Sequence, residues 1–475
     1  MDKFDLAVIG AGAAGLSVTA VAAQLGLRVA LIERGRMGGD CLNTGCVPSK
    51  ALLAAAHAAM DARAAGRFGL RIPVPEVAWE AVQAHVQGVI ATLAPMDSAT
   101  RFTALGATVL HGEARFIGRD TLEVALPDGP RRLTARRIVI AAGSRAVLPA
   151  IAGLAEVPHV TNEALFDLPE RPTHLIILGG GPIGLEMAQA HAGLGCRVTM
   201  VEADRIAGRE DSELADGLRA ALAGNGIEVL EGVPAVRAER GPALLLRDGR
   251  RIAGSHLLVA AGRRPNIEGL GLEAGGVQAG PAGIATDAGL RSPSNRRVFA
   301  VGDIADPRGI GPRAFTHVGS YHAGIVIRRA LFHLPARVDY AALPRVIYTD
   351  PELAQVGLTE AEARAAGHDI RVLRWPLAEN DRAQTERRPE GLVKLVATRR
   401  GRLLGAGILA PHAGEMIGMW GLAIAQHTNL SALAGLIVPY PTLAEAGKRA
   451  AGTFFMDRLF APATKRLVRL LAWLP

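Results

Sequence analysis

Two of the chain's three cysteines stand five positions apart, in the stretch GGDCLNTGCVPSK (38–50). Cys41 and Cys46 could form a redox-active disulfide, bind a metal ion, or be two unrelated buried thiols. A zinc site takes about four ligands, usually CxxC pairs with histidines nearby, and here only His57 lies close in sequence. The spacing therefore disfavours a metal site. A redox-active pair is the favoured interpretation, with two buried thiols as the alternative.

The residues after the pair give Cys46 a place where a thiolate is stabilised. A turn at CVPSK (46–50) leads into ALLAAAHAAM (51–60), whose pattern predicts a helix. Cys46 would then lie at the N-terminus of this helix, where the positive end of the helix dipole stabilises a thiolate. This position favours a reactive cysteine.

A nucleotide-binding pattern stands just before the cysteine pair. The apolar strand 6–9 enters a GxGxxG loop, a helical stretch follows, and a second strand ends at Glu33. In this loop Gly10 permits a tight turn, Gly12 lets the backbone approach a pyrophosphate, and Gly15 allows close packing of helix on strand. The helix N-terminus then offers free N–H groups to the phosphates. Glu33 can accept hydrogen bonds from a ribose diol.

The same pattern recurs in the middle of the chain, as GGGPIG (179–184) followed by a strand that ends at Glu202. In both copies the acidic residue lies 18 positions after the last glycine. Two similar strings, IVIAAGSR (138–145) and LLVAAGRR (257–264), follow the two copies. The repeat predicts two dinucleotide-binding domains. The alternative is a degenerate, empty second domain.

Two dinucleotide sites in one chain predict a tightly held flavin, FAD, and a diffusing nicotinamide nucleotide, since hydride must pass between two carriers. Glu202 bears on which nicotinamide nucleotide binds. Its carboxylate would repel a 2′-phosphate, which favours NAD(H) over NADP(H). Arg205 and Arg209 lie just downstream and would weaken this preference.

Composition bounds the remaining functions. At 475 residues the chain is too long for one hydrophobic core, so several domains are expected. The net charge is +8, but the basic residues are scattered and only 4% of residues are aromatic, so no nucleic-acid partner is expected. No apolar run is long enough to span a membrane, and no signal peptide precedes the first strand. Since three cysteines make no disulfide framework, a cytoplasmic enzyme is expected.

The cysteine stretch resembles the signature of the class I pyridine nucleotide–disulfide oxidoreductases, the family of dihydrolipoamide dehydrogenase, glutathione reductase and mercuric reductase. Three further strings resemble the same family: VFAVGDIA (298–305), AAGRRPNIEGL (260–270) and LPRVIYTDPELAQVGLTEAEA (343–363). The resemblance extends from about residue 4 to about residue 455.

This resemblance implies an α/β fold of the glutathione reductase type, with two Rossmann-like dinucleotide-binding domains and a C-terminal α+β dimerisation domain. It also implies a homodimer with active sites shared between subunits. The expected segments are the first part of the FAD-binding domain (1–148), the NAD(P)-binding domain (149–266), the second, central part of the FAD-binding domain (267–340), the dimerisation domain (341–461) and a basic amphipathic tail (462–475).

Roles for individual residues follow from the resemblance alone. Cys46 would be the thiol next to the flavin, and Cys41 the thiol that meets the substrate. Lys50 and Glu186 would form an ion pair beside the flavin and the nicotinamide. The expected FAD contacts are Gly10, Gly12, Gly15, Glu33, Gly39, Lys50, Ala114, Ser144 and Asp303. The expected NAD contacts are Gly179, Gly180, Gly181, Gly184, Glu202 and Gly262.

One departure from the resemblance concerns the acceptor side of the site. Dihydrolipoamide dehydrogenases and glutathione reductases carry a histidine before the proline that matches Pro441, with a glutamate that matches Glu445. Here Tyr440 replaces the histidine, and a phenol with an ordinary pKa of about 10 is a poor general base at neutral pH. A tyrosine is typical of mercuric reductases, but their C-terminal cysteine pair has no counterpart here. Cys196 is expected to be a packed core thiol.

The sequence therefore predicts an FAD-dependent NAD(P)H:disulfide oxidoreductase that passes electrons from NADH through FAD to Cys41 and Cys46. The acceptor would be a disulfide, metal or other electrophile, either a small molecule or a small protein. Two alternatives stay open. One is a flavin oxidase or quinone reductase, and the other is a membrane-associated flavoprotein with vestigial redox chemistry.

The second alternative rests on the tail. From Met456 on, apolar residues alternate with Arg458, Lys465, Arg466 and Arg469. Such a segment predicts an amphipathic helix. It would lie either on an acidic surface, such as the inner membrane, or against the protein's own dimer.

Overall fold

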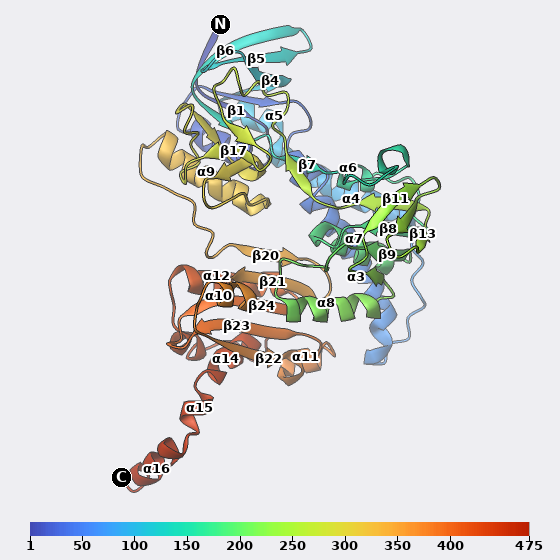
Figure 1. Cartoon of the computed structure of the whole chain (residues 1–475), viewed down its shortest axis with the longest axis vertical. Helices are drawn as coiled ribbons and strands as arrows, with labels where there is room; N and C mark the ends of the chain where they lie inside the picture. Colours follow the sequence, from blue (N-terminus) through green and yellow to red (C-terminus); the bar gives the residue numbers. More distant parts are fainter. Residues whose placement is uncertain (475) are drawn as a thin grey trace. The chain divides into compact units, whose positions relative to one another are not determined.

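The computed structural model describes residues 1–474, which form two compact units (Figure 1). The first unit holds residues 1–54, 78–171 and 257–338. The second unit holds residues 55–77, 172–256 and the chain from residue 339 on. Each unit contains one of the two GxGxxG loops.

The first unit is built on a sheet whose central strands are parallel. Its strands run in the order β3-β2-β1-β6-β5-β4, and β18 also pairs with β6. The pairs β3-β2, β2-β1, β1-β6 and β6-β18 are parallel, whereas β6-β5 and β5-β4 are antiparallel. The bounds are β1 (Asp2–Ile9), β2 (Val29–Glu33), β3 (Ala107–His111), β4 (Glu113–Phe116), β5 (Thr121–Leu126), β6 (Gly129–Ile140) and β18 (Val298–Ala300).

The apolar composition of β1 and β2 follows from their position inside this sheet. Leu6, Ala7 and Val8 of β1 are almost fully buried, as expected for parallel strands covered on both faces. Helix α1 (Ala13–Gln24) follows β1 and packs on α9 (Thr316–Ala330). The other helices of this unit are α2 (Gly39–Asn43), the start of α3 (Cys46–Ala64), α4 (Trp79–Leu93), α5 (Ala99–Ala104) and α6 (Asn162–Leu165).

The two similar strings at 138–145 and 257–264 end beside each other in the first unit. Strand β7 (Ser144–Ala146) pairs antiparallel with β15 (Arg263–Pro265). A small sheet of β16 (Ala279–Gly280), β17 (Gly283–Thr286) and β19 (Ala305–Pro307) lies in the same unit. The β7–β15 pairing joins parts of the chain that are far apart in sequence.

The second unit repeats the nucleotide-binding arrangement. Strands β8 (His174–Leu178), β9 (Arg197–Val201) and β10 (Glu228–Leu230) pair in parallel in the order β10-β9-β8. Helix α7 (Pro182–Gly193) connects β8 to β9, and α8 (Ser212–Gly224) connects β9 to β10. A three-stranded antiparallel sheet of β11 (Ala235–Glu239), β12 (Ala243–Leu246) and β13 (Arg251–Ala253) follows.

The C-terminal part of the second unit is an antiparallel sheet covered by helices. Its strand order is β20-β21-β24-β23-β22, and α12 packs on β21 and β24, with Trp420 almost fully buried in the core. The bounds are β20 (Pro344–Ile347), β21 (Glu352–Gly357), β22 (Ile370–Pro376), β23 (Leu392–Thr398), β24 (Leu403–Ala410), α10 (Glu360–Ala365), α11 (Asp381–Thr385), α12 (Ala413–Ala425), α13 (Leu430–Ala434) and α14 (Ala444–Thr453).

The chain then continues into a tail. Helices α15 (Met456–Leu459) and α16 (Pro462–Leu471) follow α14, and neither buries a residue (Figure 1). Over residues 1–474, no helix is both long enough and apolar enough to cross a bilayer. The architecture agrees with the predicted α/β fold class, while the segment boundaries at 148, 266, 340 and 461 stay a prediction.

Candidate functional site

The cysteine pair lies where two helices meet in the first unit. Cys41 belongs to α2, and Cys46 is the first residue of α3, as the sequence predicts. The structure holds both as thiols, joined by a hydrogen bond between their side chains. The sequence predicts a turn at CVPSK, but this stretch is helical; Pro48 is tolerated because it lies in the first turn of α3, where no N–H group is needed for a helical hydrogen bond.

A hydroxyl group completes the surroundings of the pair. Thr316 Oγ1, at the start of α9, lies 3.3 Å from Cys46 Sγ. The hydrogen bond with Cys46 and burial together raise the pKa of the Cys41 thiol well above its usual range, and the nearby Asp40 carboxylate adds to this. The arrangement therefore disfavours a thiolate on Cys41, while the Thr316 hydroxyl can donate a hydrogen bond to Cys46 Sγ.

The segment before Cys41 lies directly over the first glycine loop. Gly38 N donates to Ala11 O at 2.9 Å. Gly39 has a positive φ of 60°, and a Cβ on it would lie 2.7 Å from Gly12 Cα. A side chain at position 39 would push the two segments apart, so this glycine allows the redox segment to cover the loop.

The first loop has the geometry of a dinucleotide cradle. Gly10 has a φ of 106°, and a Cβ on Gly15 would lie 1.9 Å from Gly10 O. Glu33 accepts from Ala11 N at 2.6 Å and from Gly35 N at 2.7 Å, so its carboxylate orients the loop backbone. Among the described residues no side chain caps α1, and its first N–H groups remain available to phosphate oxygens. These residues fit the pyrophosphate of FAD.

The second loop has nearly the same geometry. Gly179 has a φ of 117°, and a Cβ on Gly184 would lie 2.0 Å from Gly179 O. Glu202 accepts from Gly180 N at 2.6 Å, as Glu33 does from Ala11 N. A Cβ on Gly181 would meet nothing within 4 Å. At the matching position of the first loop, a Cβ on Gly12 would lie 3.9 Å from Gly39 Cα, so both loops leave room at the glycine that a pyrophosphate would approach.

Ser144, Asp303 and Ala114 are further predicted FAD contacts, and they lie in different surroundings. Ser144 Oγ donates to Asp303 Oδ2 at 2.6 Å, and burial raises the pKa of the Asp303 carboxyl. Gly262, a predicted NAD contact, accepts from Val147 N in the same strand region. Ala114 is buried in β4, where it pairs with Val124, so its side chain serves the sheet.

Two further predicted residues belong to different units. Lys50 lies on α3 in the first unit, and Glu186 lies on α7 in the second. Glu186 is 5% exposed, and its carboxylate accepts from Tyr348 N at 3.1 Å. The ion pair between Lys50 and Glu186 stays a prediction.

Tyr440 is exposed on the second unit, and Glu445, nearby in the sequence, is half-buried. The Tyr440 side chain is exposed, and its hydroxyl donates to Asp381 Oδ2 at 2.7 Å. This hydrogen bond and the negative charge of Asp381 raise the pKa of Tyr440. Glu445 forms an ion pair with Arg449 at 2.8 Å. Tyr440 is thus an even poorer base than the sequence alone predicts.

Several residues of the first unit escaped the sequence prediction. Thr316 is one; it lies next to His317, whose ring stacks on Phe315. His322 is another, fully buried, with its Nδ1 accepting from Gly302 N at 3.0 Å and its pKa lowered by burial to about 4. Thr316 and His322 lie six residues apart on α9, and no sequence pattern indicates the contact of either one.

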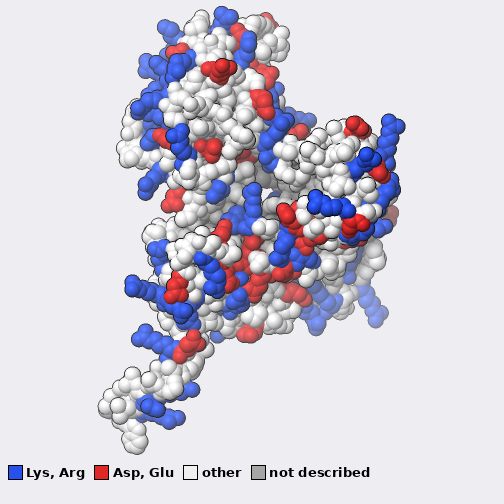
Figure 2. Space-filling model, viewed as in Figure 1, with Lys and Arg blue, Asp and Glu red and all other residues white. Residues whose placement is uncertain are grey.

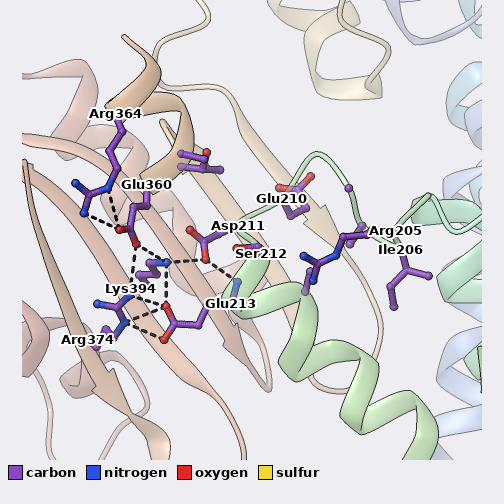
Figure 3. A pocket seen from close by; sticks show the side chains of 15 residues that line it. Arg205, Ile206, Glu210, Asp211, Ser212, Glu213, Glu360, Arg364, Arg374 and Lys394 are labelled. Carbon is purple, nitrogen blue, oxygen red and sulfur yellow. Dashed lines mark hydrogen bonds and ion pairs between the residues drawn. The ribbon is translucent and has the colours of Figure 1, made fainter. Parts of the chain in front are cut away.

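A charged hollow of about 550 Å³ in the second unit holds none of the predicted cofactor contacts (Figure 3). Lys394 of β23 is 4% exposed, and its Nζ lies 2.9 to 3.0 Å from carboxylate oxygens of Asp211, Glu213 and Glu360. Burial disfavours the charge on Lys394, but these hydrogen bonds outweigh burial and raise its pKa. Arg364 and Arg374 also pair with these carboxylates, so three cationic side chains balance three anionic ones between α8 and the sheet.

Comparison with known sequences places these features in context. The sequence model described as pyridine nucleotide-disulphide oxidoreductase matches residues 4–328, and the model of the dimerisation domain of that family matches residues 343–451. A mercuric reductase from Streptomyces lividans is 40% identical over 466 residues, covering 96% of this chain and 97% of that protein. A dihydrolipoyl dehydrogenase from Geobacillus stearothermophilus is 34% identical over 461 residues, covering 94% of each chain.

Solved structures give the same result. The Cu(II) complex of the HOCl-induced flavoprotein disulfide reductase RclA from Escherichia coli superimposes with a TM-score of 0.85 and 28% identity, covering 95% of this chain and all of that one. LpdA from Mycobacterium tuberculosis superimposes with a TM-score of 0.85 and 26% identity, covering 95% of this chain and 99% of that one. The similarity therefore spans both glycine loops, the cysteine pair and the C-terminal sheet.

Proposed function

Because this chain belongs to the pyridine nucleotide-disulphide oxidoreductase family, we propose that it takes electrons from NADH and delivers them through FAD, Cys41 and Cys46 to an electrophilic acceptor. FAD is the flavin expected for the family, and the dimerisation-domain match supports a homodimer. The observation that carries the proposal is the position of the dithiol, at the start of α3 and directly after a segment that covers the first glycine loop.

The chain's own groups account for the transfer to the acceptor. Bound FAD would supply the two-electron relay between nicotinamide and disulfide. With a disulfide acceptor, the Cys41 thiolate attacks one sulfur and releases the other half as a thiol. Cys46, whose thiolate is stabilised by the N-terminus of α3, then attacks Cys41 and releases the second thiol. Two electrons and two protons leave the protein, and the Cys41–Cys46 disulfide remains.

A turnover assay tests this proposal. NADH oxidation should require both cysteines with lipoamide, glutathione disulfide, Hg(II) and quinones as acceptors, so Cys41→Ser and Cys46→Ser should each abolish it. Cys196→Ser is the matched control, because Cys196 is buried in the second unit. Turnover that survives the loss of both cysteines would instead identify a flavin oxidase or quinone reductase. No turnover with any acceptor would favour vestigial chemistry.

The surroundings of Tyr440 bear on the acceptor. A disulfide acceptor releases a thiolate that must take up a proton, and the hydrogen bond to Asp381 raises the pKa of Tyr440 and makes the phenol a poor proton donor at neutral pH. We therefore favour acceptors that need no such proton donor, such as a soft metal ion or a reactive electrophile. Tyr440→His should raise lipoamide turnover, and an unchanged rate would contradict this argument.

The surroundings of Glu202 support NADH as the donor. Its two carboxylate oxygens accept from Gly180 N and Asp204 N, which fixes the negative charge at the end of β9. Arg205, the nearest candidate for binding a 2′-phosphate, is paired with Asp216 at 2.5 Å. The basic residues downstream of Glu202 thus weaken the preference for NADH less than the sequence suggests.

The tail supports a peripheral contact with an anionic membrane, at the cytoplasmic face. On α16, Lys465, Arg466 and Arg469 share one side, while Leu467, Leu470 and Leu471 share the opposite side. Residues 458–475 contain no Asp or Glu, and Figure 2 shows the tail as uncharged side chains edged with Lys and Arg. Two such helices would repel each other, whereas anionic lipid attracts this charge.

Vesicle sedimentation tests the membrane contact. The full-length protein should pellet with vesicles of anionic phospholipid and stay in solution with zwitterionic ones. Leu467→Ser/Leu470→Ser should abolish pelleting, and Leu25→Ser, an exposed leucine of the first unit, is the control. Equal behaviour with both lipids, or dissociation of the dimer by the double substitution, would show that the tail packs on protein instead.

A further inference from the structure

Asp40, the residue directly before Cys41, has a carboxylate held in place from three sides. Thr44 Oγ1 donates to Oδ1 at 2.7 Å, and Asn162 Nδ2 donates to the same oxygen at 3.0 Å. Arg263 Nη2 lies 3.0 Å from Oδ2. Asn162 Nδ2 also donates to Thr44 O at 3.0 Å, so the short helix of Cys41 is fastened at both ends.

Arg263 connects this carboxylate to the predicted flavin contacts. Its Nε donates to Ser144 Oγ at 2.8 Å, and its Nη2 donates to Ser144 O at 2.9 Å. Ser144 Oγ in turn donates to Asp303 Oδ2 at 2.6 Å. A continuous chain of hydrogen bonds therefore runs from Asp40 through Arg263 and Ser144 to Asp303, entirely within the first unit.

We propose that Asp40 and Arg263 are positioning residues, which fix the Cys41 helix on the strand pair β7–β15 and balance the charge that the thiol pair experiences. This inference rests on the proposed redox role of the cysteines. Neither residue belongs to the glycine loops or to the cysteine pair, and their side chains are brought together only by the fold.

The charged groups around Cys41 determine whether each substitution favours or disfavours its thiolate. The groups that act on the Cys41 thiol are Cys46 from α3, Thr316 from α9 and Asp40 from its own helix. Asp40 opposes formation of the Cys41 thiolate, and the guanidinium of Arg263 offsets that carboxylate. Loss of the Asp40 charge should therefore favour the thiolate, and loss of the Arg263 charge should disfavour it.

A charge-balancing role and a purely structural role predict different changes in thiol reactivity. If the two residues only held the loop together, Asp40→Asn and Arg263→Gln would change the thiols in the same direction. If they balance charge, the two variants shift reactivity in opposite directions, and the double variant returns towards wild type. Asn and Gln keep groups that can hydrogen-bond, so most of the loop's fastening is retained.

The test is the alkylation rate of the reduced holoenzyme with iodoacetamide as a function of pH, with each adduct located by peptide fragmentation. We expect Cys41 to react about three to ten times faster at neutral pH in Asp40→Asn, and slower by a similar factor in Arg263→Gln, as for one charge at short range near a protein surface. Glu268→Gln is the matched control, because Glu268 pairs with Arg145 of the same strand pair and is exposed.

Two results would overturn the proposal. One is a shift of the two single variants in the same direction, or none beyond that of Glu268→Gln. The other is an equal shift in Asn162→Ala, which loses a hydrogen bond to Asp40 but no charge. Flavin content and melting temperature identify a variant that has not folded. Alkylation requires no turnover, so this result stands apart from whether NADH reduces the cysteines.

Discussion

The two glycine loops have the same backbone but different surroundings. Gly10 and Gly179 both have positive φ, and the last glycine of each loop packs against the carbonyl of the first. In each loop a carboxylate at the end of the next strand accepts from a loop N–H at 2.6 Å. The repeated sequence pattern therefore encodes one backbone geometry used twice.

The difference lies in what covers each loop. The segment before Cys41 crosses the first loop so closely that Gly39 has no room for a Cβ beside Gly12. The second loop is crossed by the segment of Ile206 and Ala207: Ala207 N donates to Gly180 O at 2.9 Å, and a Cβ on Gly180 would lie 2.7 Å from Ile206 Cγ2. The segment over the first loop leads directly to Cys41, whereas the segment over the second loop leads to α8. Neighbouring segments thus distinguish two sites that the motif makes alike.

The largest effect is expected from variants that disrupt the backbone geometry shared by the two glycine loops. Gly15→Ala and Gly184→Ala would each place a Cβ within about 2 Å of a backbone carbonyl oxygen. Each should lower the free energy of unfolding by at least about 3 kcal/mol, measured by urea unfolding. Gly224→Ala is a control, because its Cβ would meet nothing within 4 Å. A mild effect in only one of the two loops would show that their packing is not equivalent.

The next effect separates the first loop from the second. Gly39→Ala should cost about 1–3 kcal/mol and reduce retained flavin, because it combines positive φ with a 2.7 Å contact. Gly181→Ala should leave the melting temperature unchanged and raise KM for NADH about tenfold, because the added methyl group fills space left for a pyrophosphate. If Gly181→Ala instead lost flavin, the assignment of the two loops would be reversed.

Each unit contains a buried histidine whose pKa is lowered to about 4 by burial, His322 in the first unit and His191 in the second. The pKa of His322 is about 4 in the folded chain and about 6.5 when unfolded, because burial excludes the charged form. Its contribution is complete above about pH 6.5 and is lost as pH falls towards 4, where the unfolded chain binds the additional proton. His322→Gln should remove about 1–2 kcal/mol of this dependence, measured by urea unfolding with flavin fluorescence. An unchanged slope between about pH 7 and pH 5 would contradict the assignment.

The smallest effect concerns the choice of nicotinamide nucleotide. Glu202→Ala should shift the ratio of kcat/KM for NADH over NADPH by about tenfold towards NADPH, since the repelling carboxylate is gone. Glu33→Ala, the equivalent change in the first loop, should reduce flavin retention and leave that ratio unchanged. Steady-state kinetics with both nucleotides measures the two variants. Equal changes in the ratio would mean that the loops do not bind different cofactors.

The features that the sequence predicted depend on residues that lie close together along the chain. Both glycine loops, the acids that follow them and the place of Cys46 at a helix N-terminus depend on residues within about one βαβ unit, where backbone geometry follows local pattern. The hydrogen bond of Thr316 to Cys46 and the pairing of Asp40 with Arg263 join distant segments. Such contacts depend on how β7, β15 and α9 pack, which a single sequence does not show.

Tyr440 illustrates the same limit on the acceptor side. The sequence identified the replacement of a histidine, and from it a weak base. The structure adds Asp381, whose carboxylate accepts a hydrogen bond from the phenol and raises the pKa of Tyr440. That partner lies 59 residues away along the chain and has no motif of its own.

Thiol counting under anaerobic conditions tests directly whether electrons from NADH reach Cys41 and Cys46. The oxidised holoenzyme is mixed with one equivalent of NADH, and alkylated cysteines are then located by mass spectrometry. If the electrons reach this pair, Cys41 and Cys46 both become alkylated, and a long-wavelength thiolate-to-flavin absorbance band appears before alkylation. The Cys46→Ser variant should show no such band. Full reduction of the flavin by NADH with both cysteines still in a disulfide would contradict this electron path.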